Sequence, residues 1–437
     1  MLLGFKIKNF KSFKELQHFS LIASKVRNNE KHIVEKNNKK ILKFSGIYGA
    51  NGSGKSNLIV AMDFINDLLD YGTNFIIDNL YFRGEEILIN EPSYFEYELL
   101  INNKFYSYGF EIIIKEKKII SEWLIDMTTR EKIIFERNVK DGTYEKSTYL
   151  KKGSALNCLE EMRTNSTILY LNELIRRTMM SNIKDDYIEE VEKIYNFFKN
   201  DFIVIRPDTH KIFGFDFLDN SEEKIKILNQ LDINIEKFDI VDEDLKNIKN
   251  LLPDNIFSNL MNEINSLKHE NKHKKLTIRV ANNVYVASID ENDEPVIKSL
   301  SFRHKNCKDP FGTYEESDGT IRIIELLDVI FSKGKVFVID ELDNSLHPIL
   351  VNGFLSKFLN SDNNNQLIVT THESKTLDFE LVRRDEIWFV EKGSDCASRI
   401  YSLEEFKDIA RFDKKIDKAY MEGRFGAIAK IDLDYED

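Results

Sequence analysis

The stretch GANGSGKS, residues 49–56, decides the fold of this 437-residue chain. It has the spacing G-x-x-x-x-G-K-S, in which glycines let successive backbone N–H groups converge on a phosphate. An apolar run at 41–48 precedes it and predicts a strand, and apolar residues at helical spacing follow at 57–69. Strand, glycine loop and helix in this order predict a P-loop that holds the phosphates of a nucleotide.

The residue types of this loop each suit one part of a Mg²⁺-nucleotide. Lys55 supplies a cation for the β- and γ-phosphates, and the Ser56 hydroxyl is a candidate Mg²⁺ ligand. The candidate nucleotide-binding residues of this segment are Gly49, Asn51, Gly52, Ser53, Gly54, Lys55, Ser56 and Asn57.

A second motif, VFVIDE at 336–341, reads as a buried strand that ends in two carboxylates. Asp340 is the candidate ligand of Mg²⁺, and Glu341 is placed to orient and deprotonate an attacking water. Alone, the motif is equally an ordinary transition from strand to loop. Together with the P-loop, it favours a catalytic site.

Three further candidates have simpler structural explanations. Ser317 begins SDGT at 317–320 and is a good helix N-cap. Asp343 is equally suited to cap the turn that follows it. His372 ends an apolar strand at 367–369, where a satisfied structural histidine is the common case.

These motifs resemble a known family when taken together. KIKNFKSF at 6–13 resembles the opening of ATPases related to SMC and RecF proteins, and GKSNL at 54–58 is similar to their P-loop. SDGT resembles a shortened ABC signature, DELDNSLHP at 340–348 resembles the Walker B motif and D-loop, and TTH at 370–372 resembles the segment of the switch histidine.

The resemblance implies an α/β fold: an ABC-type P-loop NTPase head, with a mixed sheet flanked by helices, an antiparallel β subdomain and an inserted, mainly helical lobe. We expect an N-terminal ATPase lobe at 1–125, the insert at 126–275 and a C-terminal ATPase lobe at 276–437. Aromatic and β-branched runs at 94–126 predict the antiparallel sheet, and the polar stretch at 26–40 predicts a surface loop.

For the site, the resemblance implies ATP and Mg²⁺ as cofactors and a head-to-tail homodimer. Ser317 and Gly319 would contact the γ-phosphate that the other protomer holds. Asp343 would belong to a D-loop at the dimer interface. His372 would sense the γ-phosphate. The implied catalytic residues are Glu341, His372 and Lys55, and the implied metal ligands are Ser56 and Asp340. Two features depart from the pattern: the signature is incomplete, and 60–200 contains no glutamine for a Q-loop.

The whole pattern resembles the ABC-like ATPases of overcoming-lysogenization-defect and abortive-infection systems, most closely the stand-alone ATPase type, and YMEGRFGA at 420–427 resembles the end of that subgroup. This implies a sensor or regulator of a separately encoded effector, a nuclease, in antiphage defence. Two alternatives stay open. One is a DNA-repair ATPase of the RecF kind, and the other is a self-contained nuclease. The acidic tail with Asp432, Asp434 and Glu436 mimics a metal motif, but no strand precedes it to aim the carboxylates, so it is interpreted as a solvated tail.

Composition limits the partners. The net charge of −12 disfavours a general affinity for nucleic acid, although a local basic stretch at 25–43 leaves DNA, a phage component or a partner protein open.

No apolar run approaches the roughly 18–20 residues that span a bilayer, so we expect no membrane partner. The first residues do not read as a signal peptide, and the three cysteines lack the spacing of a zinc site or disulfide framework. We therefore expect a cytoplasmic protein.

Overall fold

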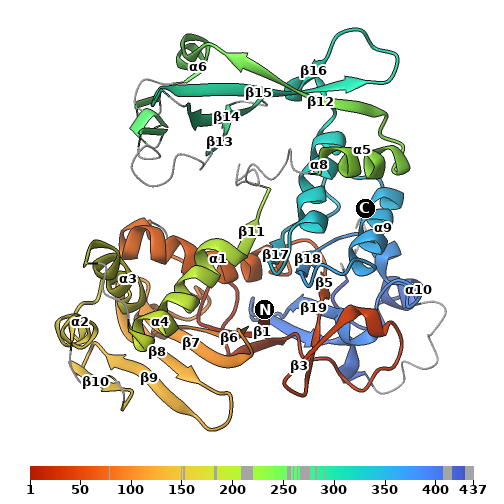
Figure 1. Ribbon diagram of the computed structural model, residues 1–437. Coiled ribbons are helices and arrows are strands. Elements are labelled where there is room, and N and C mark those ends of the chain that lie inside the picture. Colours follow the sequence, from red (N-terminus) through yellow and green to blue (C-terminus); the bar gives the residue numbers. More distant parts are fainter. Residues whose placement is uncertain are drawn as a thin grey trace, which may run out of the picture. The chain divides into compact units, whose positions relative to one another are not determined.

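The computed structural model in Figure 1 describes the chain except residues 78, 149, 151–152, 182–184, 208–219, 253–256, 259, 263, 266–275, 281–282, 291, 407–415 and 429–437. The chain divides into two compact units. The first comprises Met1–Arg206, Lys333–Leu342 and Leu359–Asp437, and the second comprises Pro207–Ser332 and Asp343–Phe358. The three-part division expected from the sequence stays a prediction.

A mixed six-stranded sheet forms the centre of the first unit (Figure 1). Its order is β11 (Phe202–Ile205), β17 (Val336–Ile339), β18 (Gln366–Thr370), β5 (Phe44–Tyr48), β19 (Ile387–Lys392) and β20 (Ser398–Ser402). The first five strands are parallel and β20 is antiparallel. Every residue of β5, β17 and β18 is buried, as expected for parallel strands covered on both faces.

The helix α1 (Lys55–Tyr71) begins directly at the glycine loop. Its apolar residues enter one continuous core with both sheets of the first unit. The ring of Phe64 stacks on that of Phe95 at a centroid distance of 4.8 Å. The loop therefore leads from a buried strand into a helix that is anchored by packing, which fixes its conformation.

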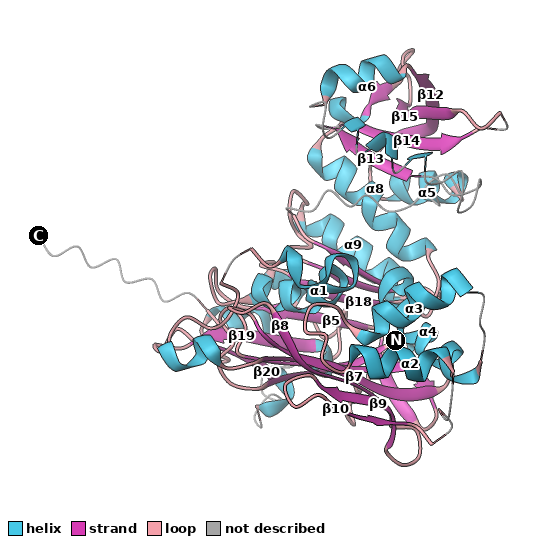
Figure 2. Cartoon of the chain, turned by 90° about the vertical axis from the view of Figure 1, so that its left-hand side faces the viewer, coloured by secondary structure: helices cyan, strands magenta, loops and turns pink. Residues whose placement is uncertain are grey.

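The second sheet of this unit has seven antiparallel strands, drawn in magenta in Figure 2. Its order is β10 (Thr143–Lys146), β9 (Lys132–Asn138), β8 (Lys118–Asp126), β7 (Lys104–Ile113), β6 (Ser93–Ile101), β1 (Leu2–Lys8) and β2 (Gln17–Ser20). The antiparallel sheet predicted at 94–126 is thus confirmed, and it also takes in β9, β10 and the first two strands of the chain.

Helices α2 (Ser154–Met162), α3 (Tyr170–Ser181) and α4 (Asp186–Asn196) follow this sheet, and a π turn at Phe197–Asp201 leads into β11. A fully buried ion pair joins the sheet to these helices. The Arg137 guanidinium donates to the Glu122 carboxylate at 2.8 Å and to the carbonyl of Met162 at 2.6 Å. Glu122 in turn accepts the backbone N–H of Tyr170 at 2.7 Å, which satisfies the start of α3.

The second unit contains a small antiparallel sheet and helices, among them α6, which packs on the sheet (Figure 2). Its elements are α5 (Ser221–Gln230), β12 (Ile235–Glu243), α6 (Leu245–Leu251), β13 (Leu276–Val280), β14 (Asn283–Ile289), β15 (Pro295–His304), β16 (Phe311–Gly312), α8 (Asp318–Phe331) and α9 (Pro348–Leu359). The sheet order is β12-β15-β14-β13, with β16 also on β15. A buried ion pair joins α5 to α8, with Lys224 Nζ 2.7 Å from Asp328 Oδ1.

Two stretches of the chain differ from the sequence-based expectation. The prediction of a simple loop at 26–40 is wrong, because β3 (Ile33–Lys36) and β4 (Lys39–Leu42) form a hairpin. Residues 41 and 42, predicted to begin the strand before the P-loop, belong to β4 instead. The segment at 126–275, expected to be mainly helical, also contains four strands among its described residues: β9 and β10 extend the antiparallel sheet, β11 is the edge strand of the central sheet, and β12 pairs with β15. Among the described helices, none has the length and apolar character needed to cross a membrane.

The architecture confirms the predicted class: an α/β P-loop NTPase fold that combines a mixed sheet, an antiparallel sheet and flanking helices.

Candidate functional site

The central sheet brings the separate motifs of the first unit to one edge. Ile339 pairs with Val369, and Thr370 pairs with Ile47, so β17, β18 and β5 are adjacent and in register. Because the strands are parallel, the residues that follow them emerge at the same carboxyl edge. Adjacent strands lie about 4.8 Å apart, which puts the ends of β17 and β5 about 10 Å from each other. This distance suits a triphosphate and one cation between them.

The glycine loop itself depends on one close approach. Gly54 has φ of 112°, which side chains rarely tolerate, and a Cβ there would meet Ser12 Oγ at 2.7 Å and would also collide with the Ser398 hydroxyl. The loop is thus pressed against two serines that lie far away in the sequence.

These serines brace the loop through hydrogen bonds. Ser398 Oγ donates to the carbonyl of Ser53 at 2.5 Å, and its backbone N–H donates to the Ser12 carbonyl at 2.7 Å. Asn57 Nδ2 donates to Ser12 Oγ at 2.9 Å. Asn57, predicted to contact the nucleotide, therefore contacts Ser12 in this conformation. Ser12 comes from the KIKNFKSF segment, which ties that motif physically to the loop.

Lys55 lies over the loop. Its ammonium donates to the carbonyl of Gly49 at 2.7 Å and to that of Ala50 at 3.2 Å, and the residue is only 5% exposed. The buried charge is thus held within the concavity of the loop, where phosphate oxygens would be stronger acceptors than the two carbonyls.

The Walker B residues are held by a residue that the sequence analysis did not assign. Thr370 Oγ1 donates to Asp340 Oδ1 at 2.5 Å and accepts the backbone N–H of Glu341 at 2.8 Å. Glu341 has φ of 51°, a left-handed conformation that costs a non-glycine residue about 1–3 kcal/mol. Thr370 therefore fixes the direction of Asp340 and supports the strained backbone from which the Glu341 side chain extends.

The loop region has the chemistry that a Mg²⁺-nucleotide needs. Ser53 is 4% exposed, and its hydroxyl has no hydrogen-bond partner among the described residues. The N-cap of α1 is Gly54, at which no side-chain cap hydrogen bond is described, so the first N–H groups of the helix suit an anionic ligand. Ser56 is exposed at that turn and Asp340 is buried at the end of the adjacent motif. A phosphate would satisfy the orphaned donors, and Ser56 and Asp340 would hold Mg²⁺.

Within the described ranges, no group of three or more His, Cys, Asp and Glu side chains gathers as a metal site.

His372 is exposed at the same edge, two residues beyond the end of β18. Its neighbour Thr371 is buried and donates its backbone N–H to the carbonyl of Ile47 at 3.2 Å, which ties the switch segment to the strand of the P-loop. The site thus collects Lys55, Ser56, Asp340, Glu341 and His372 on one unit.

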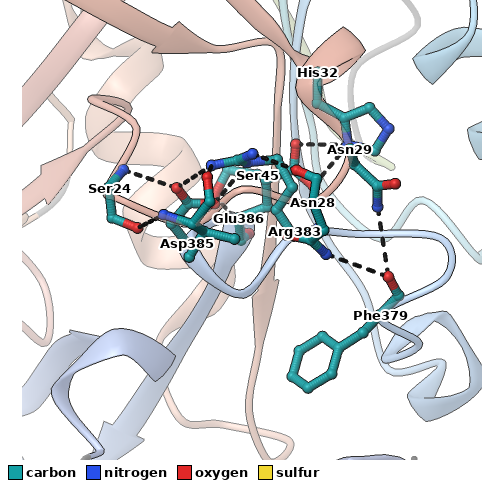
Figure 3. A network of polar contacts seen from close by, with 10 residues as sticks. Ser24, Asn28, Asn29, His32, Ser45, Phe379, Arg383, Asp385 and Glu386 are labelled. Atoms are coloured by element: carbon teal, nitrogen blue, oxygen red, sulfur yellow. Dashed lines mark hydrogen bonds and ion pairs between the residues drawn. The ribbon is translucent and has the colours of Figure 1, made fainter. Parts of the chain in front are cut away.

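A buried polar network holds the chain that follows His372 (Figure 3). The Arg383 guanidinium donates to both oxygens of Asp385, at 2.9 and 2.7 Å, and to the carbonyl of Asn28 at 2.5 Å. Asp385 also accepts the backbone N–H of Ser24 at 2.8 Å. Arg383 is fully buried, so these bonds compensate a charge that would otherwise be very costly.

The same network includes a histidine–carboxylate contact. His32 Nδ1 lies 3.0 Å from Glu386 Oε1, and Ser45 of β5 donates its hydroxyl to the Glu386 carbonyl at 3.2 Å (Figure 3). Burial raises the pKa of Glu386 above its ordinary value, and the contact with His32 opposes this rise. The network connects the basic stretch near the N-terminus to the strand that carries the P-loop.

The remaining predicted residues lie in the second unit. Ser317 caps α8, since its hydroxyl accepts the N–H of Thr320 at 3.0 Å. A Cβ on Gly319 would meet the carbonyl of Ser345 at 2.7 Å, so the signature-like turn lies against the D-loop-like segment. The carbonyl of Asp343 accepts the N–H of Leu346 at 3.0 Å. The roles of these residues toward a nucleotide stay a prediction.

Comparison with protein families gives one match. Residues 44–153 and 173–378, more than half of the chain, match the family described as "AAA domain, putative AbiEii toxin, Type IV TA system". No curated protein matches the chain.

Several solved structures of SMC heads are similar to the chain. One is an SMC head bound to the C-winged-helix domain of ScpA, with 16% identity and a TM-score of 0.40, covering 92% of this chain and 99% of that one. The SMC head from Thermotoga maritima has 14% identity and a TM-score of 0.36, covering 92% and 98%. An SMC head with an extended coiled coil, bound to the C-terminal domain of ScpA from Pyrococcus furiosus, has 17% identity and a TM-score of 0.40, covering 94% and 98%.

Proposed function

Since the chain belongs to this family of AAA domains and is a P-loop NTPase, we propose that it binds ATP with Mg²⁺ and hydrolyses it at the carboxyl edge of the central sheet. The observation that carries the proposal is the adjacency of β17, β18 and β5, which puts Asp340 and Glu341 beside the switch segment and the P-loop.

Each residue of the edge has a defined task in the proposed reaction. The N–H groups of the loop and the Lys55 ammonium bind the β- and γ-phosphates. Bound Mg²⁺, held by Ser56 and Asp340, would neutralise developing charge on the phosphate oxygens. Glu341 orients a water and takes its proton as the water oxygen attacks the γ-phosphorus, so that ADP leaves and phosphate forms. His372 contacts the γ-phosphate and senses its presence.

A second copy of the chain would complete the site. Ser317 and Gly319 lie at the N-terminal end of α8, a 14-residue helix whose dipole favours an anion. In the proposed head-to-tail dimer this turn binds the γ-phosphate held by the P-loop of the partner, and Asp343 belongs to the segment at the interface. ATP then forms part of the interface, and its hydrolysis releases the two protomers.

In the cell, we assign the dimer the role of a sensor that regulates a separately encoded effector, a nuclease, in antiphage defence. Support comes from the description of the family, which refers to a toxin and a TA system. Coexpression with the product of the adjacent open reading frame and mass measurement of the complex test this role. ATPase activity stimulated by DNA, with no such complex, would favour a repair function instead.

The Glu341→Gln variant tests hydrolysis and dimerisation together. It keeps the size and shape of the side chain, but an amide NH2 donor replaces one acceptor oxygen and the group can no longer act as a base. We expect it to bind ATP, to lose turnover and to accumulate as a dimer whose mass is measured by light scattering. Wild-type turnover in this variant would refute the assignment of the base, and a monomer with bound ATP would refute the dimer.

A further inference from the structure

The C-terminal motif YMEGRFGA, residues 420–427, lies beside the P-loop and has no task in the mechanism above. It begins within α10 (Ile416–Met421), and a turn leads from the helix to residue 428. This segment belongs to the first unit, as the P-loop does.

Aromatic rings seat the segment on the base of the P-loop. Tyr420 stacks on Phe389 with centroids 5.5 Å apart, and it meets Tyr48 edge-on at 6.3 Å. Phe425 also stacks on Phe389, at 5.9 Å. Phe389 pairs with Tyr48 in the sheet, and Tyr48 immediately precedes Gly49. The rings therefore pack against the strand end from which the loop starts.

Hydrogen bonds fix the turn after the helix. Tyr420 donates its hydroxyl to the carbonyl of Ala427 at 3.1 Å, and Tyr401 donates to that of Phe425 at 2.7 Å. The N–H of Ala427 donates to the Glu391 carboxylate at 3.3 Å. Burial raises the pKa of Tyr420 to about 12, so its hydroxyl remains a donor at every physiological pH.

The fixed turn forms one wall of a pocket at the P-loop. This pocket has a volume of about 300 Å³. Ala427 and Ile428 line it together with Glu391 and Lys392 of β19, and residues 50–53 of the P-loop line it as well. A change in the conformation of the P-loop at this pocket would therefore directly affect Ala427 and Ile428, at the end of the docked segment.

A second set of contacts links the segment and Tyr48 to the residues that follow His372. The Tyr48 hydroxyl lies 2.8 Å from Thr376 Oγ1, and both residues are buried. Thr376 belongs to the short helix Ser374–Thr376, which begins two residues after His372 and against which α10 packs. The segment consequently touches the supports of both the phosphate loop and the switch histidine.

We propose that residues 416–428 are a positioning element of the nucleotide site, such that docking of this segment and binding of ATP stabilise each other. The proposal rests on ATP binding, as proposed above. Because coupling between two sites is reciprocal, ATP must protect the docked segment by the same factor by which the segment raises the affinity for ATP.

Two measurements on the full chain test this coupling. In the first, Tyr420→Ala removes the ring and the hydroxyl, whereas Met421→Ala changes the next residue of the same helix, whose side chain is 60% exposed. We expect Tyr420→Ala to weaken binding of a fluorescent ATP analogue about fivefold or more, the lower range of typical coupling. Met421→Ala should bind as the wild type does, and Tyr420→Phe, which keeps the ring, should recover most of the affinity.

The second measurement leaves the sequence of the segment itself unchanged. Hydrogen exchange in the wild-type segment at 420–428 should slow when ATP is added, and it should stay unchanged when ATP is added to Lys55→Ala. The coupling would be refuted if ATP did not change the exchange rate of the segment in a wild type that binds ATP. It would also be refuted if folded Tyr420→Ala bound the ATP analogue with the affinity of the wild type. Wild-type protein that binds no ATP would instead refute the proposed function.

Discussion

Removing the hydroxyl of Thr370 is the sharpest perturbation that the site offers. Thr370→Val keeps the shape of a β-branched side chain at the end of β18, where the residue is fully buried. It removes the donor to Asp340 and the acceptor for the N–H of Glu341. The first loss costs about 1.5–3 kcal/mol because the partner is a carboxylate, and the loss of the acceptor for the half-buried N–H of Glu341 costs about 1–3 kcal/mol.

The added methyl group recovers about 0.8 kcal/mol, so the free energy of unfolding should fall by about 2–5 kcal/mol. The larger consequence concerns Mg²⁺. Outer-shell partners of metal ligands typically change metal affinity or activity by about 10–100-fold, and we expect a loss of that size in ATP turnover. Part of this loss should be recovered at high Mg²⁺ concentration, because Asp340 remains present but poorly oriented.

Urea unfolding and ATPase assays over a range of Mg²⁺ concentrations measure both effects. Thr371→Val is the matched control, since it makes the same chemical change one residue further on, where the hydroxyl accepts the N–H of Glu373 and does not contact Asp340 in any described hydrogen bond. Thr370→Ser restores the hydroxyl and should restore turnover. If Thr370→Val unfolds at the wild-type urea concentration and shows the wild-type Mg²⁺ dependence, Thr370 does not position the Walker B carboxylates.

Three further predictions address the scaffold around the site. Burial raises the pKa of the Cys158 thiol to about 12. Alkylation of the native protein between pH 7 and 9, followed by mass spectrometry, should therefore leave Cys158 unmodified while the two exposed cysteines react. Equal alkylation rates for all three thiols would contradict the fold of α2. Arg137→Met leaves the buried Glu122 charge uncompensated and should cost about 3–5 kcal/mol in chemical unfolding, and a loss below about 1 kcal/mol would contradict the buried ion pair. Gly319→Ala brings a Cβ to within 2.7 Å of the Ser345 carbonyl and should lower stability by about 1–3 kcal/mol, measured by thermal unfolding; an unchanged melting temperature would show that this turn is looser than described.

The sequence was sufficient to predict the fold class because the P-loop and Walker B motifs each join a periodic pattern to a local chemical signal. The run at 336–341 is apolar until it ends in carboxylates, and together with the P-loop this pattern predicts a buried strand with functional groups at its tip. β11 was missed because Phe202–Ile205 directly follows the helical pattern of α4 and is too short to show a period of its own.

The β3–β4 hairpin had a signal that the sequence analysis did not use. Asn37 and Asn38 occupy its turn with φ of 47° and 60°, and paired asparagine at positive φ is typical of tight hairpins. The high content of lysine and asparagine in this stretch led to the prediction of a loop instead.

The supporting residues of the site could not be predicted from sequence patterns. Ser12, Ser53 and Ser398 meet only because β20, the P-loop and the N-terminal segment are brought together by the tertiary fold. Serine and threonine are common everywhere in such a chain, and their role depends on which atoms they face. The adjacency of Thr370 to Asp340 likewise follows from the register of β17 and β18, which no local pattern specifies.

Titration of ATP against the wild type and Lys55→Ala, each with and without Mg²⁺, tests the central claim most directly. The buried Lys55 ammonium faces the concavity of the loop, so its loss should weaken ATP binding by on the order of 100-fold, and chelation of Mg²⁺ should weaken binding to the wild type. If Lys55→Ala binds ATP as tightly as the wild type does, the glycine loop and the two carboxylates do not form a nucleotide site.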